Sequence, residues 1–238
     1  MDLTGFHANG FEMVPGVVPP PTIESLRSLL GQHARNAGER GGLRDLFRLS
    51  PALKELAAGE YLRPLVNAVL GADAAAVRAI LFDKTAMANW KVVWHQDVTI
   101  AVREQRMTPG YGPWSVKARI IHVQPPSEIL EQMVALRIHL DPCGSSKGPL
   151  KVLPGTHRFG KLSSDRIDQL RRAHEPVTCV AEEGDVLMMR PLLLHASSPA
   201  VVPGHRRVIH IEYSNASLAP GLQWHAAVRS ARQKTSPQ

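Results

Sequence analysis

The feature that most constrains this fold is the rhythm of the chain after Val77, where short apolar or alternating runs are separated by glycine and proline. Such runs are typical of β-strands joined by tight turns. Residues 134–141 give the clearest case, because Val, Leu, Ile and Leu alternate there with Ala, Arg, His and Asp. Many short strands of this kind predict an antiparallel double-sheet jelly roll.

The first third of the chain follows a different pattern. Apolar residues recur every three or four positions after Thr22, and again over residues 51–58 and 60–70. This spacing predicts three helices, the first of them capped by Thr22. Residues 10–14 predict a short strand before these helices.

These patterns predict a mainly β, cupin-like fold with outer helices and an N-terminal helical region. A chain of 238 residues fits one large domain or two small ones, and β barrels and sandwiches of this size are often single domains. We expect a single domain over residues 1–228, in which a helical region (20–72) packs on the jelly roll (76–215). Residues 229–238 lack a core pattern and are expected to form a flexible tail.

The cysteine content and the apolar runs bear on the compartment. Cys143 and Cys179 are too few for a disulfide framework or a cysteine zinc site, and they fit a reducing compartment. No secretory signal is recognisable, and no apolar run approaches the ~20 residues of a membrane helix. We therefore expect a cytoplasmic protein without a membrane partner, either a monomer or a homodimer.

The charge distribution argues against a nucleic-acid partner. The net charge of +7 comes from 28 basic and 21 acidic residues, which in itself is compatible with nucleic-acid binding. However, residues 1–100 hold ten of each sign, and no run exceeds two adjacent basic residues. This pattern favours scattered solvated charge with a few cations inside an anion-binding pocket.

Residues 94–97 read Trp-His-Gln-Asp, and a distant histidine, His195, follows an apolar run. Side chains two positions apart on a strand share a face, so His95 and Asp97 should project together. Two histidines and one carboxylate form the facial triad that binds iron(II) and leaves positions open. The spacing alone is weak evidence among eleven histidines, and a structural histidine bonded to a carbonyl is the alternative for His95.

Further candidates come from polar positions near these strands. The Gly/Pro-rich segment over residues 100–115 is either a lid or substrate wall, or an ordinary surface connection. Trp114 and Lys117 are candidate substrate contacts. His139 is a third, although a histidine that only supports its neighbours explains it as well. Motifs for dinucleotide binding, for phosphate loops and for serine hydrolases are absent from the sequence.

Several segments occur in a family-specific order. They are residues 94–97, 148–150, 154–157, 184–186, 195–197 and 206–207. With Gly10-Phe11 and Lys84, they give a sequence that resembles the phytanoyl-CoA dioxygenase family of iron(II)/2-oxoglutarate oxygenases over nearly the whole chain.

The resemblance implies a double-stranded β-helix and iron(II) held by His95, Asp97 and His195. It also implies a 2-oxoglutarate cosubstrate, which reacts with O2 to give succinate and CO2 while a C–H bond of a small metabolite is hydroxylated. In related halogenases a small residue replaces the carboxylate, so Asp97 argues against halogenation.

The resemblance further implies a binding site for 2-oxoglutarate. Arg206, eleven residues past His195, would pair with its distal carboxylate, with Arg207 as the fallback. Ser197 would add a hydroxyl group to the same cosubstrate.

Arg137 departs from the family pattern, in which an aromatic or small residue is common. It could contact 2-oxoglutarate, an anionic substrate, or a structural carboxylate such as Asp141. Three other functions stay open: a nucleic-acid-directed dioxygenase, a non-catalytic or sensing member that retains the metal site, and a cupin-like protein with another metal.

Overall fold

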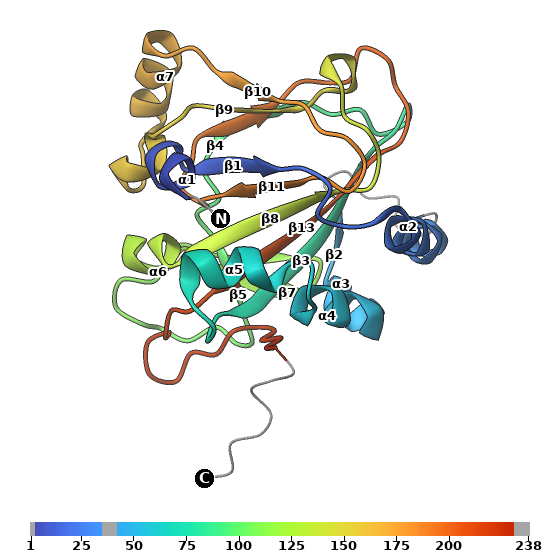
Figure 1. The fold of residues 1–238 in the computed structure, drawn as a ribbon. Helices are drawn as coiled ribbons and strands as arrows, with labels where there is room; N and C mark the ends of the chain where they lie inside the picture. Colours follow the sequence, from blue (N-terminus) through green and yellow to red (C-terminus); the bar gives the residue numbers. More distant parts are fainter. Residues whose placement is uncertain (1–2, 35–41, 231–238) are drawn as a thin grey trace.

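The computed structural model describes residues 3–34 and 42–230, so most of the expected C-terminal tail lies outside the described residues. Two antiparallel sheets dominate the fold, and the smaller lies above the larger in Figure 1. In spatial order, the larger sheet contains β1 (Phe11–Val14), β11 (Val186–Met189), β8 (Met133–His139), β13 (Arg206–Ser214), β3 (Ala75–Lys84) and β2 (Leu43–Arg44). The smaller sheet contains β10 (Val177–Cys179), β9 (Leu150–Val152), β12 (His195–Ser197) and β4 (Val92–His95).

A third sheet of three strands flanks this pair. It contains β5 (Ile100–Val102), β7 (Ile120–Val123) and β6 (Trp114–Lys117). Every strand pairing in the three sheets is antiparallel. The predicted jelly roll is therefore confirmed.

The helices surround these sheets. They are α1 (Thr4–Asn9), α2 (Pro20–Ala34), α3 (Leu46–Leu49), α4 (Pro51–Ala58), α5 (Arg63–Leu70), α6 (Ser127–Glu131) and α7 (Ser164–Ala173), with 3-10 turns at η1 (Ser145–Lys147) and η2 (Thr156–Phe159). The predicted cap at Thr22 is wrong, because α2 already begins at Pro20, where the first turn of a helix tolerates proline. Among the described helices, none has both the length and the apolar character needed to span a membrane.

The main core lies between α2, α4, α5 and the outer face of the larger sheet (Figure 1). Leu136 of β8 and Ile209 of β13 are fully buried against these helices, and the Tyr213 hydroxyl donates to the Ala57 carbonyl at 3.0 Å. Because side chains alternate along a strand, Arg137 and His210 turn to the opposite face, towards the smaller sheet. The polar positions of β8 and β13 therefore line the interior of the jelly roll.

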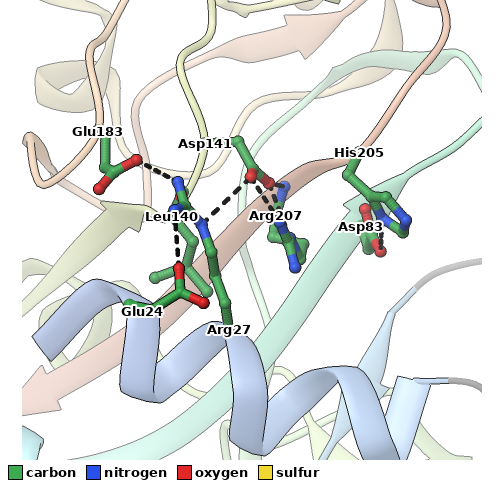
Figure 2. A network of polar contacts seen from close by, with 8 residues as sticks. All are labelled: Glu24, Arg27, Asp83, Leu140, Asp141, Glu183, His205 and Arg207. Atoms are coloured by element: carbon green, nitrogen blue, oxygen red, sulfur yellow. Dashed lines mark hydrogen bonds and ion pairs between the residues drawn. The ribbon is translucent and has the colours of Figure 1, made fainter. Parts of the chain in front are cut away.

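A network of ion pairs joins α2 to the end of β8 (Figure 2). The Asp141 carboxylate accepts hydrogen bonds from Arg207 Nε at 2.9 Å and Nη2 at 2.6 Å, and Arg27 Nε lies 3.5 Å away. Arg27 also donates to the Leu140 carbonyl and pairs with Glu183. The predicted option of an Arg137–Asp141 pair is wrong, because β8 ends at His139 and strand alternation does not extend to Asp141.

Asp141→Asn is expected to lower the free energy of unfolding by about 2 kcal/mol, because it removes the charge that answers Arg207 and Arg27 in a partly buried network. Urea denaturation measures this loss. Hydrogen bonds from Arg207 hold the pKa of Asp141 below its ordinary value, although burial acts to raise it. The carboxylate therefore stabilises the fold at neutral pH, and the difference should vanish as the pH falls below about 4.

The matched control for this prediction is Asp168→Asn. Asp168 pairs with Arg171 at 3.1 Å on the exposed surface of α7, where ion pairs contribute little. Equal losses of stability in the two variants would contradict a special role for the Asp141 network.

Candidate metal centre

Strand pairing brings the two candidate histidine ligands together. In the antiparallel pair β4–β12, His95 lies directly opposite His195, and the ring centroids are 4.2 Å apart. Strand alternation predicted that Asp97 would lie on the same strand as His95. The structure differs, because β4 ends at His95. The backbone N–H of Asp97 instead donates to the Pro191 carbonyl at 2.9 Å. Oδ1 of Asp97 lies 3.8 Å from His95 Nε2, and Oδ2 lies 3.6 Å from His195 Nε2.

The hydrogen bonds of both imidazoles define which nitrogen can bind a metal. Nδ1 of His95 lies 2.8 Å from the Val93 carbonyl, and Nδ1 of His195 lies 2.9 Å from the Leu193 carbonyl. A carbonyl only accepts, so each Nδ1 carries the proton and each Nε2 keeps a lone pair on the side of Asp97. Burial lowers the pKa of His195 to about 4, which leaves it neutral at physiological pH.

The carboxylate of Asp97 is also in the form that binds metal. Burial acts to raise its pKa, but charge interactions with the neighbouring histidines, of which His195 has the largest effect, and with Arg78 hold the pKa well below its usual range. Two neutral imidazoles and one carboxylate are a donor set suited to iron(II). These residues therefore fit the ion that the resemblance implies.

A second group of possible ligands shares Asp97. Asp97, His210 and Glu212 have donor atoms within 4.8 Å of one another, as does the group of His95, Asp97 and His195. However, His210 Nδ1 accepts from Arg137 at 3.2 Å and its Nε2 donates to Glu212 at 3.2 Å. Glu212 is also paired with Arg78. Because these lone pairs already have partners, the group that contains the two opposed histidines is the better metal site.

A cavity of about 330 Å³ opens beside the candidate ligands, between the two sheets. Besides the three candidate ligands, its lining includes Ser197, Arg206, Arg137 and Lys117, which the sequence also singled out.

Two predicted substrate contacts lie away from this cavity. Trp114 pairs in register with Val123 and packs, partly buried, against a small second core. His139 is 4% exposed, and burial lowers its pKa to about 4. Its Nδ1 lies 3.4 Å from the Asp185 carbonyl, at the closed end of the interior. The positions of Trp114 and His139 therefore do not support a role in binding substrate.

Two buried cations lie at one end of the cavity: Arg206 lines it, and Lys84 reaches the lining residue Ser197 without lining the cavity itself. Arg206 of β13 pairs in register with Lys84 of β3, and these residues are 4% and 1% exposed. Arg206 lies 3.4 Å from Ser197 Oγ, which accepts a hydrogen bond from Lys84 at 2.7 Å, and Arg206 Nε has no partner. Among the described residues, no carboxylate forms an ion pair with either cation. Burying a cation without a counter-charge costs free energy, so this end of the cavity suits an anionic ligand.

The backbone at Gly148 packs closely against the backbone at Ser198 and holds Arg206 and Ser197 in place. The Gly148 carbonyl accepts hydrogen bonds from Arg206 and from Ser197 Oγ. Gly148 has φ of +64°, and a Cβ there would lie 2.4 Å from the Ser198 carbonyl oxygen. Only glycine fits this position, which explains its place in the Gly-Pro-Leu motif.

Sequence reasoning assigned no role to Lys84. A lysine that closes an apolar strand is usually solvated, so the local pattern gave no signal. Only the register of β3 against β13 places it beside Arg206.

Comparison with known proteins gives one family and several similar folds. The family model described as phytanoyl-CoA dioxygenase (PhyH) matches residues 6–208. No curated protein matches this chain in sequence.

Three solved structures illustrate the structural similarity. The non-heme alpha ketoglutarate dependent carbocyclase SnoK from nogalamycin biosynthesis has a TM-score of 0.70 at 14% identity, over 90% of this chain and 83% of its own. EctD from S. alaskensis with 2-oxoglutarate and 5-hydroxyectoine has a TM-score of 0.67 at 18% identity, over 88% and 73%. HygX from Streptomyces hygroscopicus with iron bound has a TM-score of 0.64 at 19% identity, over 89% and 85%. At these identities, the similarity establishes a common fold.

Proposed function

This chain belongs to the phytanoyl-CoA dioxygenase family of iron(II)- and 2-oxoglutarate-dependent oxygenases, and we propose that it hydroxylates a C–H bond of a small-molecule substrate. One observation carries the proposal: the Nε2 atoms of His95 and His195 face the carboxylate of Asp97 at the wall of a cavity. Asp97 occupies the ligand position that a halide would need, which favours hydroxylation over halogenation.

In the proposed mechanism, His95 and His195 bind iron(II) through Nε2, and Asp97 binds it through a carboxylate oxygen. The carbonyls of Val93 and Leu193 hold the two rings in the coordinating orientation. Iron bound there supplies the redox chemistry that couples substrate oxidation to the conversion of 2-oxoglutarate and O2 into succinate and CO2.

The basic end of the cavity would bind 2-oxoglutarate. Arg206 would pair with its distal carboxylate, and the charge of Lys84 would act on it from beside Ser197. Ser197 would add a hydrogen bond once its hydroxyl proton turns from the Gly148 carbonyl to the carboxylate. Arg137 is assigned to the same cosubstrate. Its guanidinium lies 5.5 Å from the centre of the Phe82 ring, and burial together with the charge of Arg206 lowers its pKa to about 10. Arg137 and Arg206 lie on the paired strands β8 and β13, and both line the cavity, which supports this assignment.

The cavity volume supports a small substrate. Pockets for small molecules are typically about 300–1,000 Å³, and a volume of about 330 Å³ must also hold the cosubstrate. A compact metabolite therefore fits better than a long acyl thioester.

Oxygen uptake and succinate formation by the purified protein test this function. We expect both to require iron(II) and 2-oxoglutarate, and to increase when an accepted substrate is added from a panel of small metabolites. If the iron-loaded protein bound neither 2-oxoglutarate nor oxygen and formed no succinate, the proposal would be wrong.

The KM for 2-oxoglutarate is expected to rise as the pH rises through about 8. Burial, followed by the charge of Arg206, lowers the pKa of Lys84 to about 8, so this cation loses its charge above that pH. The affinity for the distal carboxylate should then weaken, by up to about tenfold per pH unit. Steady-state kinetics across this range measure the effect.

Two variants separate this effect from a general loss of activity at high pH. Lys84→Met should have a high KM for 2-oxoglutarate that no longer changes near pH 8. Lys91→Met, which removes an exposed lysine next to β4, should keep the wild-type profile. A flat wild-type profile would contradict a role for Lys84.

A further inference from the structure

The cavity has a second basic end. Arg78 lies six residues before Lys84 on the same face of β3, which places their backbones about 20 Å apart along the strand. Arg44 of β2 pairs in register with Ile80, close to Arg78, and Lys117 of β6 joins them. Arg44, Arg78 and Lys117 all line the cavity.

Charge interactions indicate that these three side chains are close together. Burial, followed by the charges of Arg44 and Arg78, lowers the pKa of Lys117, while Asp97 acts to raise it. Arg78 and Lys117 therefore lie within electrostatic reach of the candidate metal ligand Asp97.

The proposed cofactors leave no negative charge for Lys117. Iron(II), Asp97, 2-oxoglutarate and the three cations assigned to the cosubstrate (Arg206, Lys84 and Arg137) already carry a net positive charge. Asp97 is the one acid among the described residues of the lining, and Glu212 is committed to Arg78. Lys117 is partly open to solvent at the rim of the cavity that it lines, and it forms no ion pair with any described residue. A cation that faces a cavity without a counter-charge suits an anionic ligand.

The backbone next to Lys117 is strained. Lys117 and Ile120 pair across the β6–β7 hairpin, and the two connecting residues, Ala118 and Arg119, have φ of 50° and 64°. Such two-residue turns favour Asn-Gly, and a left-handed conformation costs other residues roughly 1–2 kcal/mol each. Strain of this kind is characteristic of functional segments, and here it fixes the hairpin that presents Lys117 to the cavity.

We propose that Lys117, Arg78 and Arg44 form an anion-binding site for a carboxylate or phosphate group of the substrate, across the metal centre from Arg206. The proposal rests on the proposed function and deepens it. The site would hold the anionic group at one end of the cavity, so that a C–H bond elsewhere in the substrate lies over the metal centre.

Calorimetry with three probes of equal chain length tests this site. Hexanoate, hexyl phosphate and the neutral hexanamide are titrated into protein that is saturated with iron(II) and 2-oxoglutarate, without oxygen and at constant ionic strength. We expect at least one anionic probe to bind about tenfold more tightly than hexanamide. The tighter of the two anions identifies a carboxylate or a phosphate as the preferred group.

Two variants assign this preference to a residue. Lys117→Gln should weaken binding of the preferred anion by about tenfold and leave hexanamide unchanged. Arg119→Gln is the matched control, because Arg119 is an exposed cation of the same hairpin outside the cavity lining, and it should bind like the wild type.

Three results would overturn the inference. With 2-oxoglutarate bound, equal affinities for anionic and neutral probes, or an unchanged affinity in Lys117→Gln, would overturn the anion site and leave the proposed function standing. An equal loss in Arg119→Gln would indicate a diffuse positive field in place of a site. Failure of the wild type to bind 2-oxoglutarate would overturn both proposals.

Discussion

His195→Ala is expected to abolish iron-dependent succinate formation. His195 contributes one of two Nε2 lone pairs directed at the Asp97 carboxylate, and the loss of a ligand should exceed the 10- to 100-fold effects, roughly, of losing a group that only supports a ligand. Succinate analysis measures turnover, and metal analysis after dialysis should show that iron is lost as well. Circular dichroism establishes that the variant is folded.

His174→Ala is the matched control for this prediction. His174 follows α7 and is exposed, so its replacement should leave the iron content and turnover unchanged. Retention of stoichiometric iron and wild-type turnover in His195→Ala would remove His195 from the metal site.

Arg206→Met is expected to raise the KM for 2-oxoglutarate by about a hundredfold. Charge-assisted hydrogen bonds to a buried carboxylate contribute about 1.5–3 kcal/mol, and Arg206 is expected to make a pair of them. Methionine keeps most of the side-chain volume and removes a buried cation that no described acid pairs with. The fold should therefore tolerate the change, which urea denaturation can verify.

Arg207, which follows Arg206 directly, provides a matched comparison for this variant. Arg207 points to the outer face of β13 and binds Asp141 there (Figure 2). Arg207→Met should therefore lose stability and keep its affinity for 2-oxoglutarate, whereas Arg206→Met should do the reverse. The opposite pattern would make Arg207 the cosubstrate anchor.

Strand alternation made much of this fold predictable. Every residue of β8 is buried, so burial alone does not separate its two faces. Polarity does separate them, because Leu136 packs under the helices while Arg137 faces the cavity. Apolar spacing likewise predicted the helix at residues 51–58, and it predicted the next helix over residues 60–70, where α5 begins only at Arg63.

The residues at which strands begin and end were less predictable. His195 begins β12 although it follows an apolar run, because residues 191–194 form a buried turn outside the strand. Asp97 likewise lies beyond the end of β4 and is held by a backbone hydrogen bond to Pro191. Contacts between segments far apart in the chain set both features, and local periodicity does not encode them.

Contacts between distant segments also decide which side chains lie near the cavity. An aromatic residue beside glycine and proline can serve as a lid or as core, and Trp114 packs on the second core because β6 pairs with β7 and places it opposite Val123. The role proposed for Lys84 also depends on a distant contact, because pairing of β3 with β13 places this strand-end lysine beside Arg206 and within hydrogen-bond distance of Ser197. Arg44 and Arg78 joined the cavity through the register of β2 and β3.

Anomalous diffraction at the iron absorption edge, from crystals grown without oxygen in iron(II) and 2-oxoglutarate, tests the central claim most directly. We expect one iron peak about 2.1 Å from His95 Nε2, His195 Nε2 and an Asp97 oxygen. The distal carboxylate of 2-oxoglutarate should lie on Arg206. An iron peak held by His210 and Glu212, or no peak beside His95 and His195, would contradict the proposed metal centre.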